Sequence, residues 1–293
     1  MRVSIVVPSF NPGPVLERAL ASLVSQAGID LQLIVMDAGS TDGSPAILER
    51  FAPDIDVLVR ERDNGQADGI NRGFTHAEGD IFGWLCADDE LMPGTLAHVA
   101  SLFEEHPAAD VVIGACERVF ADGTTCITPA RADTWDVIGM QNVIDQPSVF
   151  WRAGLHRRLG RLDDSYNLAF DWDFWCRMRA SGARFIATDR VLSRYYFSDT
   201  NKSGSSGRGH VRESFRILRQ YGPLSGGLAY VFLGLYHLFD LHGCYDRPPT
   251  CGPIRLVLHR ATLALLRLTL GTRLAYGYNW QFASRQERGL QWW

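Results

Sequence analysis

Short apolar runs alternate with helical patterns over residues 1–115, and this alternation limits the available folds more than any other feature. Val3–Pro8, Gln32–Asp37 and Ile81–Cys86 are apolar runs of strand length, and segments of helical periodicity lie between them. Strands that are buried on both faces and joined by helices occur in parallel sheets with helices on each side. The sequence therefore predicts a Rossmann-like, doubly wound, mixed but mostly parallel α/β sheet.

Residues 116–206 follow a different pattern. Their strand-like pieces are short and widely spaced, one helix is expected at Asp171–Ala180, and the Gly/Ser-rich segment Asn201–Gly209 follows. We interpret this part as the antiparallel edge of the same sheet. The predicted first domain thus spans residues 1–206, with halves of about 1–115 and 116–206.

The remaining residues, 207–293, have the opposite charge. Residues 1–206 carry 18 Lys and Arg against 29 Asp and Glu, whereas residues 207–293 carry 11 against 4. Arg212, Arg216 and Arg219 are spaced along one face of an expected helix. Gly226–Phe239 is apolar but shorter than the roughly 20 residues that span a bilayer. We predict a basic helical tail that contacts a membrane surface peripherally, forms a homodimer, or packs against its own first domain.

Composition limits location and partners. The six cysteines form no CxxC pair, so neither a zinc signature nor a disulfide scaffold is indicated. The first apolar run is too short for a signal peptide, so the cytoplasm is the expected location, with the inner face of the membrane as a peripheral site. The acidic first domain argues against nucleic-acid binding, which needs a basic surface.

Polar residues follow four consecutive predicted strands. Ser9 and Asn11 follow the first strand, Asp37 ends the second, Glu61 follows the third, and Asp88-Asp89 follows the fourth. In doubly wound sheets ligands bind at the carboxyl ends of the strands, so these groups are expected at one edge. Any one of these carboxylates alone is more simply explained as a turn former or helix cap, but acidic groups at the ends of four consecutive strands are not expected by chance.

The expected ligand is not held by a glycine-rich turn. No GxGxxG fingerprint follows the first strand, and the chain has no GxxxxGK[ST] loop. An acidic edge can instead bind a diphosphate through a divalent cation, because hard cations prefer oxygen ligands.

Six segments together resemble the GT-A glycosyltransferases of family 2. They are VSIVVPSFN, IVMDAGSTDGS, ERDNGQADGINRGF, GDIFGWLCADDELMPGTL, QPSVFWR and FDWDFWCRM, and they cover about residues 1–200. The resemblance implies an inverting enzyme of polysaccharide biosynthesis that uses manganese or magnesium. Its donor would be a nucleotide-diphosphate sugar, UDP-linked, bound by residues 1–115. Its acceptor would be a hydroxyl of a glycan or lipid-linked glycan, bound by residues 116–206.

The resemblance also implies roles for individual residues. Asp88 and Asp89 match the DxD-like site, where one carboxylate meets the metal and the other the ribose, and their assignment stays open. Cys86 stands where relatives often have a further acid, which would weaken the metal site. The donor is expected at Pro8, Ser9, Asn11, Asp37, Glu61, Asp63, Asp68, Asn71 and Asp88.

Asp171 matches the family's catalytic base, with Asp173 as the alternative. Asp171 could equally cap the helix that it begins, and the two roles are compatible. Many relatives have an RxH segment with a histidine metal ligand; here Arg194 is followed by Tyr195 and Tyr196. His210 is either a substitute ligand or a surface residue. The tryptophans 84, 135, 151, 172 and 175 are expected mostly in the core rather than stacked on sugars.

Three other functions remain as alternatives. A catalytically inactive sugar-nucleotide-binding protein would explain Cys86 and the missing histidine. An NAD-dependent oxidoreductase would need the absent GxGxxG turn. A processive polysaccharide synthase would need a QxxRW segment, and Gln281 and Arg285 do not have that spacing.

Overall fold

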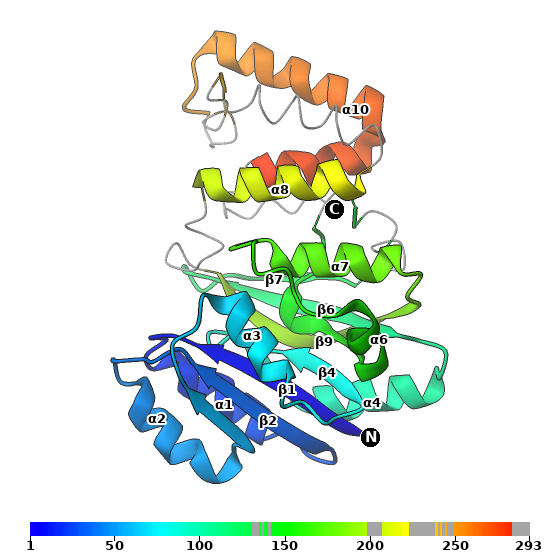
Figure 1. Ribbon diagram of the computed structural model, residues 1–293. Coiled ribbons are helices and arrows are strands. Elements are labelled where there is room, and N and C mark those ends of the chain that lie inside the picture. The colour runs from blue at the N-terminus through cyan, green and yellow to red at the C-terminus, as the bar shows by residue number, and fades with distance from the viewer. Residues whose placement is uncertain are drawn as a thin grey trace. The chain divides into compact units, whose positions relative to one another are not determined.

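The computed structural model describes residues 1–130, 142–197, 207–222 and 249–282, with positions 135, 138, 139, 238, 239, 241 and 244. The chain divides into two compact units (Figure 1). The first comprises Met1–Trp135 and Ile144–Ser198, and the second comprises Asp136–Val143 and Asp199–Trp293. This division falls before the expected boundary at residue 206 and assigns a short inner segment to the second unit.

The first half of unit 1 is a parallel sheet. Strand β1 lies between β2 and β4, and β3 flanks β2, with all four strands parallel. The carboxyl ends of these strands therefore meet at one edge of the sheet. The bounds are β1 Arg2–Ser9, β2 Asp30–Asp37, β3 Val57–Arg60 and β4 Ile81–Trp84.

The second half adds strands of both directions. Strand β8 runs antiparallel to both β4 and β6, and β9 runs parallel to β6. Strand β5 pairs antiparallel with β9, and β7 pairs antiparallel with β6. Within the described residues the order is β3-β2-β1-β4-β8-β6-β9-β5. The bounds are β5 Glu90–Leu91, β6 Val111–Phe120, β7 Thr125–Thr128, β8 Val149–Arg152 and β9 Phe185–Phe197.

Strand β9 is longer than the sequence predicts. The sequence predicts short, widely spaced strand pieces in this part of the chain, but one strand pairs with β6 from Val111 to Phe120. The register shifts between Gly114 and Cys116, as in a β-bulge. Any side chain at position 114 would overlap Leu192, so the glycine lets the two strands pass this point.

Helices cover both faces of the sheet. The expected helices are present, and the structure adds the short α6, whose seven residues are too few for a periodic pattern. The bounds in unit 1 are α1 Val15–Val24, α2 Ser44–Phe51, α3 Gln66–Phe74, α4 Thr95–Glu105, α6 Ala153–Leu159 and α7 Phe170–Ala180. Unit 2 contains α8 Gly207–Tyr221 and α10 Pro253–Phe282. Among the described residues, no helix is both long and apolar enough to cross a membrane. Most of Gly226–Phe239 lies outside the described residues.

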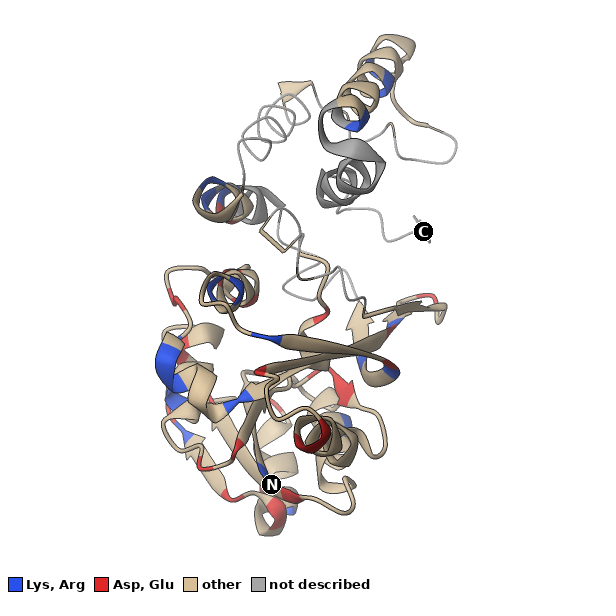
Figure 2. Ribbon diagram, turned by 90° about the vertical axis from the view of Figure 1, so that its right-hand side faces the viewer, with Lys and Arg blue, Asp and Glu red and all other residues tan. Residues whose placement is uncertain are grey.

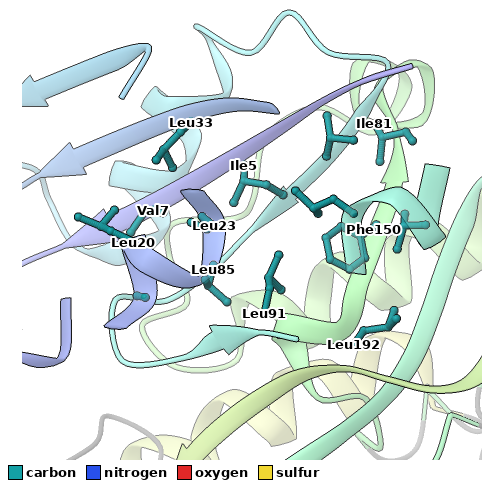
Figure 3. Packing of buried hydrophobic residues seen from close by; sticks show 14 of the residues in the cluster. Ile5, Val7, Leu20, Leu23, Leu33, Ile81, Leu85, Leu91, Phe150 and Leu192 are labelled. Atoms are coloured by element: carbon teal, nitrogen blue, oxygen red, sulfur yellow. The ribbon is translucent and has the colours of Figure 1, made fainter. Parts of the chain in front are cut away.

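Alternate residues of β1 bury into an aliphatic core on one face of the sheet (Figure 3). Val3, Ile5 and Val7 join Leu20 and Leu23 of α1 in this cluster. Because strand side chains alternate between faces, the intervening residues point to the opposite layer. There the side chain of Val6 fills the space beside Gly73 of α3, where a Cβ would overlap it.

The opposite face has an aromatic core. Trp84 of β4 stacks on Trp175 of α7 at 5.4 Å between ring centroids, and Trp151 of β8 packs edge-on against both. Phe74 and His156 extend the cluster to α3 and α6. The expectation that the tryptophans are core residues is confirmed, because all five are buried: 84, 135, 151, 172 and 175.

Candidate active site

Asp37 forms a buried anchor at the carboxyl end of β2. Its carboxylate accepts hydrogen bonds from Ser9 Oγ at 3.2 Å and from the Ser40 backbone N–H and Oγ at 3.1 and 2.5 Å. Arg60, at the end of β3, lies 3.8 Å away. The ends of β1, β2 and β3 are thus tied together around one carboxylate.

The segment after β1 closes over this anchor. Asn11 has a φ of 50°, in the left-handed region that asparagine tolerates better than most residues. In this conformation its backbone N–H donates to Ser40 Oγ at 2.8 Å, and its Oδ1 accepts from the Thr41 N–H at 2.8 Å. The structure therefore brings Pro8, Ser9, Asn11 and Asp37 together, as the sequence predicts.

The acidic residues after β3 lie in one loop but have different surroundings. Glu61 is exposed and forms an ion pair with Arg72 at 2.5 Å, while its backbone N–H donates to the Asp37 carbonyl. Asp63 accepts from the Gly65 N–H at 2.9 Å and packs against Gly69, where a Cβ would lie 2.6 Å from its Oδ2. Glu61 is therefore joined to the Asp37 anchor through the backbone.

Asp68 and Asn71 of α3 instead hold neighbouring loops. Asp68 accepts from the Asn64 backbone N–H at 3.1 Å and lies 3.4 Å from Arg161. The buried Asn71 amide exchanges two hydrogen bonds with the Leu162 backbone, at 2.8 and 3.0 Å. Because these bonds use both ends of the amide, Asn71 acts on the site by holding the segment around Leu162.

Three possible metal ligands gather directly after β4. Atoms of Cys86, Asp88 and Asp89 that could bind a cation all lie within 4.8 Å of one another. Asp89 is buried, and Asp88 and Cys86 are partly buried. Because two neighbouring carboxylates repel each other, a cation between them fits this donor set.

The electrostatic environment of Asp88 and Asp89 disfavours their charged forms. Burial raises the pKa of Asp88, although its own backbone N–H and Arg18 oppose this shift. Burial raises the pKa of Asp89 well above its usual value, and the neighbouring charge of Asp88 raises it further. A cation bound to both carboxylates would offset both effects.

Tyr196 occupies the third position of the expected RxH segment. Its backbone N–H donates to Asp89 Oδ1 at 3.3 Å, while its hydroxyl donates to Glu90 at 2.7 Å. The Arg18 guanidinium lies 3.5 Å from the centre of the tyrosine ring and forms an ion pair with Glu90. Tyr196 thus holds Asp89 through its backbone, and its hydroxyl is directed to Glu90.

Asp171 lies in the first turn of α7, beside the end of β4. The preceding residue, Phe170, is 6.3 Å from Trp84 between ring centroids, and Trp175 stacks on the same tryptophan. Asp171 Oδ1 accepts from the neighbouring Trp172 N–H at 2.6 Å, and its side chain is partly exposed. The N-cap of α7 is Ala169, without a side-chain cap hydrogen bond, so the structure does not support Asp171 as the cap of this helix. The two ring contacts fix α7 to β4, the strand that precedes the Cys86–Asp88–Asp89 cluster.

Asp173, the alternative base, is buried in a different role. It forms an ion pair with Arg177 at 2.9 Å, and Arg177 also donates to the carbonyls of Leu159 and Arg161. This arrangement connects α7 to the loop after α6. The contacts therefore favour Asp171 over Asp173 as the group that faces a substrate.

The sequence did not identify all residues around the cluster. Gln66 and Gln146 both contact the Cys86 sulfur, and Arg18 donates to the Asp88 carbonyl at 3.0 Å. Gln146 lies in the QPSVFWR segment, which was a usable signal, whereas nothing in the local sequence singles out Arg18. His210 falls within α8, but its side chain lies outside the described residues.

Comparison with known proteins decides the family. The model of glycosyl transferase family 2 matches residues 4–183, more than half of the chain. The chain belongs to glycosyl transferase family 2. This glycosyltransferase is 34% identical over 196 residues to the PGL/p-HBAD biosynthesis glycosyltransferase of Mycobacterium tuberculosis, an alignment that covers 66% of this chain and 72% of the relative. An uncharacterized glycosyltransferase of Rickettsia prowazekii is 23% identical over 212 residues, which cover 69% of this chain and 66% of that protein.

Solved structures show the same fold as this family 2 glycosyltransferase. S. aureus TarS 1-349 in complex with UDP-GlcNAc matches with a TM-score of 0.62 and 15% identity, covering 97% of this chain and 88% of that chain. The match to the longer TarS chain covers 53% of it. The mannosyltransferase PcManGT of Pyrobaculum calidifontis, in complex with GDP-Man and Mn2+, matches with a TM-score of 0.60 and 20% identity, covering 96% and 85%. The expected GT-A fold, a mostly parallel mixed sheet with helices, is confirmed.

Proposed function

We propose that this glycosyltransferase is an inverting enzyme that moves a sugar from a UDP-linked donor to a hydroxyl of a glycan or lipid-linked glycan. The Cys86–Asp88–Asp89 cluster at the end of β4 is the observation that carries the proposal. It lies one strand away from Ser9 and two away from Asp37 in a parallel sheet. A nucleotide held at Asp37 would therefore have its diphosphate near the metal ligands.

Donor binding would use the groups already gathered at this edge. The nucleobase of the donor would be surrounded by Pro8, Ser9, Asn11 and Asp37. The neighbouring loop would contribute Glu61, Asp63 and Asp68. Asp88 and Asp89 would hold manganese or magnesium and the ribose. The bound cation would supply positive charge that offsets the charge developing on the leaving diphosphate.

Asp171 would act as the base. Its carboxylate would take the proton of the acceptor hydroxyl as that oxygen forms a bond to the anomeric carbon. The bond from the anomeric carbon to the diphosphate oxygen breaks on the opposite face, and its electron pair leaves with the diphosphate. Attack and departure on opposite faces invert the configuration of the sugar. Such a base typically contributes about 10²–10⁴-fold to the rate.

Two of the other candidate functions fit these observations less well. An oxidoreductase would need a site for the pyrophosphate of NAD, and the first turn has no glycine fingerprint. An inactive binding protein would not need both a partly exposed carboxylate at Asp171 and an intact Asp88–Asp89 pair.

A membrane-bound acceptor would suit the exposed side of α10. Ile254, Val257, Leu265 and Leu268 lie on one face of this helix and are 77%, 66%, 47% and 84% exposed. His259, on the opposite face, is buried. The outward face of the helix is therefore the apolar one, which is unusual for a helix that meets water.

The charges beside this apolar face favour anionic lipid over a second copy of the chain. Arg255, Arg260 and Arg267 flank it, and the sequence of Pro253–Phe282 contains no Asp or Glu. In Figure 2 the coloured part of α10 carries blue and no red. Two copies of α10 placed face to face would bring arginines together without an acidic partner. An anionic membrane surface supplies the missing charge. The second unit would thus lie on the inner face of the membrane, with the first unit in the cytoplasm.

A donor screen tests the proposed activity. Thermal unfolding would be followed with UDP-, GDP- and dTDP-linked sugars, each with and without manganese. Ligands that bind the folded state raise the melting temperature, so a UDP-sugar with manganese should give the largest shift. If no nucleotide sugar raised the melting temperature, with or without manganese, the proposed function would be contradicted.

A further inference from the structure

Cys86 stands where an acidic residue was expected, and the structure brings its sulfur to the two carboxylates that follow. Cys86 Sγ lies within 4.8 Å of ligand oxygens of both Asp88 and Asp89. Asp89 is 1% exposed, and its Oδ1 accepts a hydrogen bond from the Tyr196 N–H. Its own backbone N–H donates to the Cys86 carbonyl at 3.0 Å, which holds the two residues together.

Two glutamine side chains hold the sulfur in place. Gln66 Nε2 donates to Cys86 Sγ at 3.2 Å. The thiol donates to Gln146 Oε1 at 3.5 Å, and Gln146 Nε2 donates to the Trp84 carbonyl at 2.8 Å. The backbone of β4 therefore fixes Gln146, and the two glutamines restrict the position of the thiol as ligand-orienting groups do.

Tyr196 of β9 stands at the position of the family's histidine ligand, but its side chain contacts Glu90 and Arg18. The Tyr196 hydroxyl donates to Glu90, and its ring lies under Arg18. Its backbone N–H donates to Asp89. The third side chain of the cluster that can offer a ligand atom is that of Cys86.

We propose that Cys86 is a metal ligand and that its thiolate gives this site a preference for thiophilic divalent cations over magnesium. The proposal rests on the metal role in the proposed function. On binding, the thiol proton passes to solvent as the sulfur–metal bond forms, without any change in oxidation state. Thiolate ligands favour zinc-like cations, whereas magnesium requires oxygen ligands, so one sulfur among two carboxylates changes the selectivity.

Cadmium is the probe, because a thiolate–cadmium bond has its own ultraviolet charge-transfer absorption. The full-length protein would be titrated with cadmium, and bound manganese would be measured separately by electron paramagnetic resonance. Cys86→Ser should abolish the absorption and weaken cadmium binding by about tenfold or more. Magnesium binding, measured by competition with manganese, should change by less than about threefold.

Two further variants separate ligation from structural damage. Cys86→Asp should lose the charge-transfer absorption but keep manganese binding. A collapsed site would lose both. Cys126→Ser removes another partly buried cysteine, on β7, and should leave both measurements unchanged. Alkylation of Cys86, located by mass spectrometry, should be slowed by cadmium only while the two aspartates are present.

The outcomes distinguish this proposal from the proposed function. One outcome is that manganese and nucleotide binding are normal and the cadmium absorption is unchanged in Cys86→Ser. This outcome would overturn the ligand role of Cys86 and leave the glycosyltransferase mechanism in place. Absence of binding for every cation in the wild-type protein would overturn both this proposal and the metal role.

Discussion

The backbone N–H of Tyr196 donates to the Asp89 carboxylate across 3.3 Å, although the two residues are 107 positions apart in the chain. The bond connects the end of β9 to the loop after β4. The position of the buried Asp89 carboxylate therefore depends on a strand that the chain adds much later. Because the donor is a backbone group, the identity of the side chain at position 196 does not determine this bond.

Asp89→Asn should reduce the affinity for manganese by about tenfold or more, because the amide retains the shape of the side chain but not its charge. Manganese bound at increasing concentration, followed by electron paramagnetic resonance, gives the affinity. Asp122→Asn changes an exposed turn residue and serves as the control. Equal affinities in Asp89→Asn and the wild type would remove Asp89 from the ligand set.

Asp171→Asn should lower kcat by about 10² or more while donor binding persists, because the proton acceptor is lost and the shape is kept. Asp173→Asn should instead lower the free energy of unfolding by about 1–3 kcal/mol, because it weakens the charged partner of Arg177. Product formation and urea unfolding of both variants separate the two roles. Wild-type turnover in Asp171→Asn would exclude that residue as the base.

Asp37→Asn should weaken UDP binding by about tenfold or more, because charged hydrogen bonds contribute about 1.5–3 kcal/mol. Isothermal titration of UDP in the presence of manganese measures the change. Asp30→Asn is a matched control, since Asp30 lies at the opposite end of the same strand and is exposed. If the two variants bound UDP equally well, the nucleotide would have to sit away from the Asp37 anchor.

His156 should make the fold less stable in acid. Burial, with smaller effects from Arg177 and Arg157, lowers the pKa of His156 from 6.5 to about 4. The unfolded chain therefore binds a proton below pH 6.5 that the folded chain does not bind until about pH 4. The free energy of unfolding should fall between these values, by roughly 2–3 kcal/mol in all.

His156→Phe should reduce this pH dependence. The ring packs against Phe74 and Trp151, and its Nδ1 has no hydrogen-bond partner in the described part of the chain, so phenylalanine keeps the packing at little cost. Urea unfolding at pH 7 and pH 4.5 gives the slope, and the exposed His76, changed to Gln, is the control. An unchanged slope in His156→Phe would show that other groups cause the acid sensitivity.

The α10 helix should bind anionic vesicles in a salt-sensitive manner. Each arginine near such a surface contributes at most about 1 kcal/mol, and salt screens the attraction over about 8–10 Å. Co-sedimentation with anionic vesicles at low and high salt measures binding, and Leu265→Gln with Leu268→Gln should weaken it. Dimers in light scattering without vesicle binding would instead assign this face to a second copy of the chain.

Local patterns were sufficient to predict the parallel half of the fold and the residues at its edge. Strands β1, β2 and β4 are buried and apolar on both faces. The polar residues Ser9, Asp37 and Asp88 lie at or shortly after their carboxyl ends. Because these strands are parallel, their carboxyl ends meet at one edge of the sheet, and this determines which residues lie together there. These features depend on neighbouring residues, so they are visible in the sequence.

The rest depends on contacts between distant segments. The continuity of β9 reflects pairing with β6 and the fit of Leu192 over Gly114, which no local pattern reveals. Asn71 appeared to be a donor-binding residue, but its amide is used to hold Leu162, 91 positions later. Cys86 appeared to be only a missing acid until its sulfur was placed beside both carboxylates.

The central claim is that the cluster after β4 binds a nucleotide diphosphate through a divalent cation. Isothermal titration of the wild-type protein with UDP, first with manganese and then with excess chelator, tests this claim most directly. The account predicts saturable binding with manganese that is lost, or weakened by at least about tenfold, when the metal is removed. Equal affinity under both conditions would contradict it.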